Sequence, residues 1–457
     1  MAKKVVKYID LFSGLGGIRI GLEQALAEMG MKGKCVFTSE IKTTAIKAHN
    51  CNFTEEHIEA TDITKVNSSD IDTFSILLGG FPCQAFSMAG SQKGFADTRG
   101  TLFFDIQRIL EGHLKDVDGF ILENVEGLVT HDKQNPKDKE GRTIKVIMQV
   151  LREKLGFNAD YKVLNAADFG VPQYRKRVYI VGCKRKYGKV NLRFTPQEHV
   201  SVGRYLEKGI PCLNNRFSRK LLSLYTPCSL NGKSLKDKRG GERNIHSWDI
   251  AQKGKVSEEQ KELLNRLLLE RRKRKWAAEI GIDWMDGMPL TIDQIRTFYD
   301  TPNLGKLLDD LVKKKYLYLE HPKKRIVNTD ENGNTWTSRL PDEKLPKGYN
   351  IVTGKLSFEI SSFLDVNKPA NTIVAMDMNT LGVVDGNGIR HLTIREGLRL
   401  FGYPEDYSLD DFSKSPKAIK EGYDLIGNSV CVPVIKAVAL RLLDKIYKTP
   451  KTKQYAN

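Results

Sequence analysis

Short apolar runs alternate with amphipathic segments through the first 190 residues of this 457-residue chain, and this alternation constrains the fold most strongly. The apolar runs are 5–11, 34–37, 74–78, 119–122 and 177–181. The amphipathic segments between them are near 17–29, 42–49, 101–114 and 143–155. Strands that are each followed by a helix predict an α/β fold with a doubly wound, mostly parallel sheet. Ligands of such sheets bind beyond the carboxyl ends of the strands, so residues that follow the runs are the candidate site residues.

A cysteine follows the third apolar run on a tight turn, in the sequence GGFPCQAFS at 79–87. Pro82 fixes its own φ angle and holds Phe81 extended, which would present the Cys83 thiol in one defined direction. A lone cysteine is more often a small apolar core residue, and this segment alone fits that role as well. The interpretation of Cys83 therefore depends on residues elsewhere in the chain.

The first predicted strand ends in a glycine-rich turn, DLFSGLGG at 10–17. Such glycines let backbone N–H groups approach a ligand, and the N-terminus of the following helix favours an anionic group. The spacing is GxGG and differs from GxGxxG, which disfavours a dinucleotide pyrophosphate. Glu40 follows the second run, where an acid typically accepts hydrogen bonds from ribose hydroxyls. The pair indicates a nucleoside-bearing cofactor with little or no phosphate, and a purely structural tight turn remains an alternative.

Two other strand ends carry charged residues. Glu123 ends the fourth run, where burial would raise its pKa unless the carboxyl group is paired, although a helix-capping or loop carboxylate gives the same pattern. Together with Cys83 it suggests thiolate attack on an electron-poor ring while a carboxyl group protonates a ring nitrogen. In QYRKR at 173–177, strand alternation directs Arg175 and Arg177 to one face, which suits a phosphate or a base carbonyl.

The chain carries a formal net charge of +17, from 73 Lys and Arg against 56 Asp and Glu. Such an excess on a folded enzyme points to a polyanionic partner, and nucleic acid is the first candidate. Residues 191–250 are rich in basic and polar residues, and the run RRKRK at 271–275 lies towards the end of a helix that we predict over 257–280. A solvated helix end that complements the helix dipole would explain this run equally well.

The cysteines and the apolar content limit the compartment. The seven cysteines are scattered and never spaced as C-x-x-C, which predicts neither a disulfide framework nor a zinc site and suits a reducing cytoplasm. No apolar run approaches the roughly 18 residues of a membrane span, so we expect no membrane-spanning helix.

Further elements are predicted after residue 250. We expect a helix near 303–315, a hairpin of 316–319 with 325–327, and helices over 393–401 and 433–447. If the last helix packs on the N-terminal sheet, the basic middle of the chain is an insertion.

Seven motifs complete the pattern, in this order: DLFSGLGG, GFPCQAFS, GTLFFDI, ENV, QYRKR, LTIREGLRLFGYP and IGNSV. The ordered set resembles the C5-cytosine DNA methyltransferases of the bacterial restriction–modification type, over about 1–190 and 369–440. The resemblance implies a catalytic domain of the adenosylmethionine-dependent type at 1–190, completed by the C-terminal helix in 420–457. It implies a smaller target-recognition domain at 191–419, with a hinge segment at 369–419 and the base-reading core near 191–368.

The resemblance also implies S-adenosylmethionine as the methyl donor. Its pocket would be formed by Phe12, Gly14, Gly16 and Gly17 at the methionine end, Glu40 at the ribose, Asp62 and Ile63 at the adenine, and Pro82, Leu102, Asn428 and Val430. Cys83 would be the nucleophile, Glu123 would hold or protonate cytosine N3, and Arg177 would bind the base O2 with Arg175 close by. Arg395 and Glu396 would anchor the variable region. One residue departs from the family pattern, because Leu425 stands where many members carry glutamine.

The implied activity is methylation at C5 of a cytosine that has been flipped out of a specific site in double-stranded DNA. The expected protein is a cytoplasmic monomer that protects DNA beside a cognate restriction endonuclease, whose existence the sequence leaves open. Three alternatives stand beside this interpretation: an RNA cytosine-5 methyltransferase on the same fold, a DNA-binding regulator that has lost catalysis and, more remotely, a nicotinamide dehydrogenase. The intact set of Cys83, Glu123 and Arg177 argues against the regulator.

Overall fold

The computed structural model describes residues 4–82, 102–135, 137–238, 243–329, 335–353 and 358–448, which form two compact units. The first unit contains 1–208, 366–379 and 392–457, and the second contains 209–365 and 380–391. The boundaries of these units differ from those of the predicted domains, because 191–208, 366–379 and 392–419 fall in the first unit. The Tyr407 hydroxyl donates to the Leu15 carbonyl at 2.8 Å, which ties 392–419 to the glycine-rich turn at 10–17. The Glu207 N–H donates to the Glu396 carboxylate at 2.7 Å, which ties 191–208 to 392–419.

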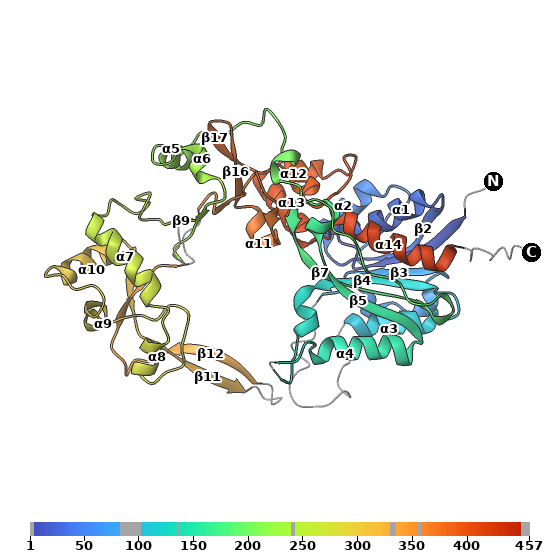
Figure 1. Cartoon of the computed structure of the whole chain (residues 1–457), viewed down its shortest axis with the longest axis horizontal. Coiled ribbons are helices and arrows are strands. Elements are labelled where there is room, and N and C mark those ends of the chain that lie inside the picture. Colours follow the sequence, from blue (N-terminus) through green and yellow to red (C-terminus); the bar gives the residue numbers. More distant parts are fainter. Residues whose placement is uncertain are drawn as a thin grey trace, which may run out of the picture. The chain divides into compact units, whose positions relative to one another are not determined.

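The first unit is built on a six-stranded sheet with the order β2-β1-β3-β4-β7-β5 (Figure 1). The pairs β1–β2, β1–β3 and β3–β4 are parallel, whereas β7 runs antiparallel to both β4 and β5. This mostly parallel α/β sheet confirms the predicted fold class. The strands are β1 (Val5–Leu11), β2 (Lys32–Ser39), β3 (Ile76–Gly79), β4 (Gly119–Val125), β5 (Phe157–Asn165) and β7 (Lys176–Lys184).

Helices cover both faces of this sheet, with α1 and α14 on one face and α3 and α4 on the other (Figure 1). On the second face, Ile106 and Ile144 join Leu77, Phe120 and Ile180 of the strands in one apolar core. The chain turns from β2 on one side of β1 to β3 on the other, so a topological switch point lies between β1 and β3. The helices are α1 (Gly17–Glu28), α2 (Thr43–Asn52), α3 (Leu102–Gly112), α4 (Arg142–Gln149) and α14 (Val432–Tyr447).

The C-terminal helix α14 packs on α1 and on the strands β4 and β7, as the sequence led us to expect. By length and composition alone, the segment Pro416–Tyr447 could cross a membrane. It is divided into α13 (Pro416–Asn428) and α14, and 67% of its most apolar window is buried inside the protein. Its apolar face is therefore that of core helices.

The remaining elements of the first unit surround α13. The two-residue strand β6 pairs with β15, and the helix α12 begins at a capping box in which Thr393 and Glu396 bond each other's backbone N–H groups. Glu396 is fully buried, which gives it a structural role at the start of this segment. The elements are β6 (Gln173–Tyr174), β15 (Ala370–Asn371), α11 (Ala375–Met378) and α12 (Ile394–Arg399).

The second unit contains a five-stranded sheet of short strands, two separate two-stranded sheets and six helices among its described residues. One apolar core joins α7, α10 and β13, and another lies around the five-stranded sheet. The helices are α5 (Arg216–Leu222), α6 (Pro227–Leu230), α7 (Glu258–Glu270), α8 (Lys275–Glu279), α9 (Ile292–Arg296) and α10 (Leu304–Lys313). The strands are β8 (Ser234–Leu235), β9 (Asn244–Ile245), β10 (Leu317–Glu320), β11 (Lys323–Thr329), β12 (Thr335–Pro341), β13 (Gly348–Ile351), β14 (Ser362–Phe363), β16 (Leu381–Asp385) and β17 (Gly388–His391).

Two predictions for this unit are wrong. The helix expected over 257–280 is interrupted between α7 and α8, because the Trp276 indole N–H and the Lys273 N–H take the Glu270 carbonyl that a continuing helix would bond at Arg274. The expected hairpin is also absent, since β10 pairs with β13 and β11 pairs with β12. The link between β10 and β11 is His321-Pro322, and proline cannot adopt the positive φ that a tight type I′ turn requires.

The contact between α1 and α14 gives a test of the fold. A Cβ atom on Gly21 would lie 2.5 Å from Cγ2 of the buried Ile435, so the helices approach closely only because this residue is glycine. We expect Gly21→Ala to lower the free energy of unfolding by about 1–3 kcal/mol through overpacking. Urea unfolding followed by circular dichroism measures this, with Gly127→Ala as the control because a Cβ there meets nothing within 4 Å. Equal losses in both variants would contradict the close approach.

Candidate active site

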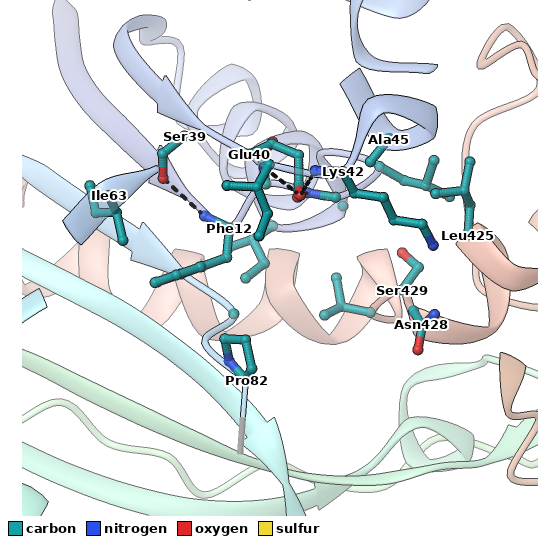
Figure 2. Close-up of a pocket in the computed structure, with 18 of the residues that line it drawn as sticks. Phe12, Ser39, Glu40, Lys42, Ala45, Ile63, Pro82, Leu425, Asn428 and Ser429 are labelled. Carbon is teal, nitrogen blue, oxygen red and sulfur yellow. Dashed lines mark hydrogen bonds between the residues drawn. The ribbon is translucent and has the colours of Figure 1, made fainter. Parts of the chain in front are cut away.

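A cavity of about 300 Å³ lies at the carboxyl ends of β1 to β4, next to the topological switch point (Figure 2). It lies within the first unit, and residues 425–430 at the end of α13 close one side. Ten of the eleven residues proposed for the cofactor line it: Phe12, Gly14, Gly17, Glu40, Asp62, Ile63, Pro82, Leu102, Asn428 and Val430. The exception is Gly16.

The turn after β1 is held in an unusual backbone conformation. Phe12 has a φ of 58°, which is uncommon for a residue with a side chain, and Gly14 has a φ of 54°. Ser39 at the end of β2 supports the turn, because its hydroxyl accepts from the Phe12 N–H at 3.3 Å and its carbonyl accepts from the Ser13 N–H at 3.1 Å. Such positive φ values persist only where the surrounding structure enforces them, and they cluster at ligand sites.

Glu40 joins the end of β2 to this turn. One carboxylate oxygen accepts from the Gly14 N–H at 2.8 Å, and the other accepts from the N–H groups of Ile41 and Lys42 at 2.9 Å each (Figure 2). A carboxylate offers about four acceptor positions, so three backbone bonds orient the group and leave capacity for a ligand hydroxyl. Its position in the cavity wall fits the ribose-binding role that the sequence suggested.

Gly16 is required by packing. It caps α1 in the left-handed conformation with a φ of 68°, and a Cβ atom there would lie 2.5 Å from the Phe53 ring. The Arg19 guanidinium also packs on this ring, with its carbon 4.0 Å from the centre of the Phe53 ring. The turn therefore needs this glycine even without a ligand.

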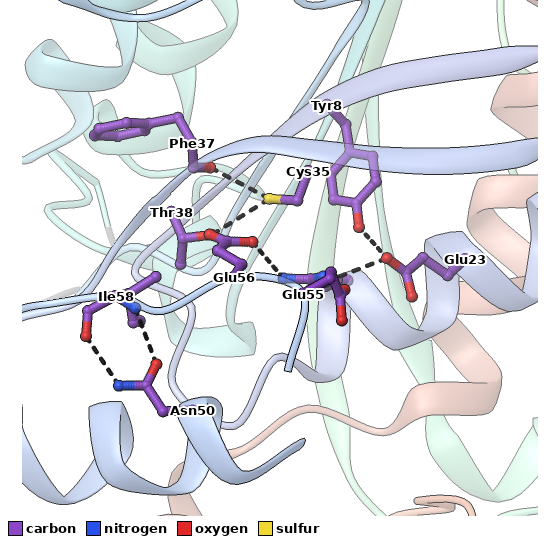
Figure 3. Close-up of polar contacts among 10 residues, drawn as sticks. Tyr8, Glu23, Cys35, Phe37, Thr38, Asn50, Glu55, Glu56 and Ile58 are labelled. Carbon is purple, nitrogen blue, oxygen red and sulfur yellow. Dashed lines mark hydrogen bonds and ion pairs between the residues drawn. The ribbon is translucent and has the colours of Figure 1, made fainter. Parts of the chain in front are cut away.

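Arg19 connects Glu23 of α1 with Glu55 and Glu56, three acids that Figure 3 labels. Its guanidinium is 1% exposed and pairs with three carboxylates, those of Glu23 at 3.2 Å, Glu56 at 2.8 Å and Glu55. Glu23 also accepts from the Tyr8 hydroxyl. These bonds fix residues 53–58 against α1, and the chain then continues directly to the cavity residues 61–63.

Glu123 lies in the cavity wall at the end of β4 and is 9% exposed. Burial raises the pKa of its carboxyl group, and the guanidinium of Arg177, whose Nε is 3.2 Å away, opposes that rise. A Cβ on Gly80 would lie 3.8 Å from Glu123 Oε2, so the carboxyl group lies beside the segment that leads to Cys83. The neighbouring Asn124 amide donates to the Phe81 carbonyl at 2.8 Å and fixes that segment. Cys83 itself lies outside the described residues.

Strand alternation predicts Arg175 and Arg177 on one face, and in the structure the two side chains have different bonding partners. Arg175 falls between β6 and β7, is 3% exposed, and donates to the carbonyls of Ile373 at 2.7 Å, Gly427 at 3.2 Å and Ser429 at 2.7 Å. All its bonds thus hold the chain beside the cavity. Arg175 therefore positions the IGNSV segment, whereas Arg177 reaches the carboxyl group of Glu123.

Several cavity residues escaped the sequence analysis, notably Ser39, Lys42 and Ser429. Lys42 comes two residues after Glu40, which is the only sequence signal for it, and its ammonium group pairs with Asp424 on α13. Leu425, which departs from the family pattern, also lines the cavity and is 4% exposed. The nearby Cys431 is buried, and burial raises its pKa to about 12, which leaves its thiol unreactive.

The buried carboxyl group of Glu123 predicts a pH dependence of stability. Because its pKa is raised above 4.5, ionisation of Glu123 destabilises the folded state. This cost is absent below pH 4.5, grows as the pH rises from 4.5 towards the raised pKa, and is constant above it. We therefore expect Glu123→Gln to gain stability relative to the unsubstituted protein as the pH rises above 4.5. Urea unfolding across this range measures the difference. Glu59→Gln, at an exposed position, is the control, and parallel curves for Glu123→Gln would contradict the assignment.

Comparisons with known proteins agree with this geometry. The family model "C-5 cytosine-specific DNA methylase" matches residues 6–444. The type II methyltransferase M.NlaIV of Neisseria lactamica is 56% identical over 96% of this chain and 99% of its own length. M.NgoBV of Neisseria gonorrhoeae is 54% identical, and M.BanI of Aneurinibacillus aneurinilyticus is 36% identical over 95% of this chain and 94% of its own length.

The family match spans both units, and the two Neisseria relatives are matched along almost their whole length. The chain therefore belongs to the C-5 cytosine-specific DNA methylase family and is a DNA (cytosine-5)-methyltransferase.

Proposed function

We propose that the cavity of the first unit holds S-adenosylmethionine and that Cys83, Glu123 and Arg177 act on a cytosine at its edge. The observation that carries this proposal is the place of Glu123, whose buried carboxyl group lines the cavity beside the segment that leads to Cys83. The methyl donor in the cavity and the cytosine at its edge would therefore lie next to each other.

The cavity residues suit the methyl donor. The turn at 12–17 and the N-terminus of α1 offer backbone N–H groups to the donor's carboxylate, and Glu40 has acceptor capacity for ribose hydroxyls. Asp62 and Ile63 would contact the adenine. Gly16 is proposed only as a support of the turn, because Phe53 occupies the space beside it. When bound, S-adenosylmethionine supplies an electrophilic sulfonium methyl group to C5 of the activated ring.

The protein must first make cytosine C5 nucleophilic. The Cys83 thiolate adds to C6 while the Glu123 carboxyl group gives its proton to N3, and the ring becomes an enamine with electron density at C5. Burial favours this step, because it raises the pKa of Glu123, so that more of the carboxyl group is protonated and able to donate near neutral pH. Arg177 would donate to O2 of the base. After methyl transfer, a base removes the C5 proton, the thiolate leaves from C6 and N3 returns its proton to Glu123, which restores the neutral aromatic ring.

The substrate is a cytosine in duplex DNA, and the base must leave the stack to meet Cys83. We assign target recognition to the second unit and suggest that the protein works as a cytoplasmic monomer. The type II names of the relatives support a protective role beside a restriction endonuclease that cuts the same sequence. Such methylation would block cleavage of the host DNA.

The covalent step gives a direct test. In the presence of S-adenosylmethionine, duplex DNA that carries 5-fluorocytosine at the target should form a stable covalent complex, because after methyl transfer the fluorine at C5 cannot leave as a proton does and the thiolate stays bound. We expect this complex with the unsubstituted protein, none with Cys83→Ser, and slower formation by about 10²–10⁴-fold with Glu123→Gln. Denaturing gel electrophoresis measures it. A complex that survives Cys83→Ser would refute the assignment of the nucleophile, and binding without any complex would favour a regulator.

The cofactor assignment has a separate test. We expect Glu40→Gln to weaken binding of S-adenosylmethionine by about 10- to 100-fold, because an amide replaces a charged acceptor. Isothermal titration calorimetry measures the affinity, and melting of the ligand-free protein checks the fold. Glu59→Gln is the matched control, since this exposed residue does not line the cavity. Unchanged affinity in a folded Glu40→Gln protein would remove Glu40 from the site.

A further inference from the structure

We infer that the hairpin of β11 and β12 enters the major groove of DNA and that Arg325 reads a guanine there. This inference rests on the proposed function, since it names the part of the second unit that contacts the substrate. The hairpin is called the ribbon below, and its odd-numbered face carries Arg325, Val327, Thr329, Thr337 and Arg339.

The ribbon is a separate two-stranded sheet, paired with no other strand of the described chain. Its antiparallel register sets Arg325 opposite Arg339 and Val327 opposite Thr337. The side chains of the odd face are exposed, and Val327 is 64% exposed although it is apolar. A hairpin with both faces in water is marginal by itself, so a long exposed ribbon suits a surface that is covered by a partner.

The charges on the odd face favour a polyanion as that partner. Two arginines directly opposite each other repel, and no acidic residue lies on either strand to offset them. Arg339 is held at the base of the ribbon, because its guanidinium donates to the carbonyls of Asp283 at 3.3 Å and Trp284 at 2.9 Å. Arg325 is exposed and makes no bond or ion pair within the described residues, so its guanidinium is available. The connecting residues 330–334 include Asp330 and Glu331, so the positive charge belongs to the strands.

The opposite face of the ribbon differs. Lys324 pairs with Asp342 at 3.5 Å, and the Asn328 amide donates to the Ser338 hydroxyl at 2.8 Å. Ile326 is half-buried there. This face satisfies its own polar groups, so the odd face is the one left to bind a ligand.

The side chains of the basic run at 271–275 have partners within the second unit, although Lys273, Arg274 and Lys275 are exposed. Arg271 is 3% exposed and donates to Asn350 at 2.6 Å, and Arg272 pairs with Asp286 at 2.6 Å. Lys273 pairs with Glu270. The last two residues of the run lie over indole rings: Arg274 over Trp284 and Lys275 over Trp276. The most basic segment of the sequence is therefore a poor candidate for reading DNA, and the ribbon is the better one.

The chemistry of the odd face matches the major groove, which admits a two-stranded ribbon and shows a distinct pattern for each base pair. Arginine binds O6 and N7 of guanine with two parallel hydrogen bonds, and the methyl groups of Val327 and Thr337 can contact thymine methyl groups. Lysine cannot reproduce the two-pronged bond of arginine. The inference therefore commits to duplex DNA as the occupant and to Arg325 as the specific contact.

The test compares Arg325→Ala, Arg325→Lys and Lys324→Ala in the full chain. Lys324→Ala is the matched control, because it removes one positive charge from the same strand on the opposite face. Each protein methylates a library of randomised duplexes, and bisulfite sequencing gives the preferred sequence. Duplexes with single substitutions then give kcat/KM at each position over a range of salt concentrations.

At one guanine position, we expect the ratio of kcat/KM for guanine to kcat/KM for the other bases to fall by about 5- to 150-fold in both Arg325 variants. At the other positions, both variants should keep the preference of the unsubstituted protein. Lys324→Ala should keep the preference of the unsubstituted protein. Arg325 variants that keep the full preference would overturn the inference, as expected if a protein partner covers the ribbon. An equal loss at all sequences with a shallower salt dependence would also overturn it, since it indicates a phosphate contact.

Two controls separate the possible failures. If Arg325→Ala fails to fold, as judged by binding of S-adenosylmethionine, Arg325→Lys decides the question because it keeps the charge and the stem. If the unsubstituted protein methylates no duplex, the proposed function fails, independently of the ribbon.

Discussion

The packing of the last helix against the first is the contact on which the site depends. The cavity needs residues from the ends of four strands and also residues 425–430, which precede α14. Gly21 lets α14 approach α1 closely, and Arg175 then ties the carbonyls of Gly427 and Ser429 to the sheet. The chain must therefore complete its C-terminal helices before the cofactor wall exists. An insertion between the sheet and these helices is tolerated because the two parts meet through their own contacts.

Two arginines near the cavity have different roles because their partners differ. Arg175 donates its hydrogen bonds to three backbone carbonyls, which orient it, and its charge lowers the pKa of Glu123 less than that of Arg177 does. Arg177 lies beside Glu123 and stabilises the ionised carboxylate, so it limits the rise in the pKa that burial causes. A carboxyl group that gives and regains a proton needs both influences. Strand alternation places both arginines on one face, and only the tertiary structure shows that their bonding partners differ.

The sequence predicts best where short-range rules decide the outcome. Glu40 and Glu123 are found because acids that directly follow apolar runs lie at the carboxyl ends of strands. The strand β5 is missed because it is an edge strand with alternate residues partly exposed, so it has no continuous apolar run. The pairing of β10 with β13 spans about thirty residues, and no local signal specifies it. Lys42 and Leu425 are found at the cavity only after α13 is placed against α2.

The same division between local and distant constraints explains which parts of this enzyme can change the DNA sequence that it recognises. The cavity residues are held by backbone bonds, as at Glu40 and at the turn after β1, so their substitution disturbs several elements together. Among the described residues, the odd face of the ribbon is held by its own two strands, by Arg339 and, at its base, by the ion pair of Lys323 with Glu320. A substitution at Arg325 or Val327 changes no buried contact, so it can alter base recognition at little cost in stability. A surface that reads DNA in this way can diverge while the chemistry of the methyl transfer stays fixed.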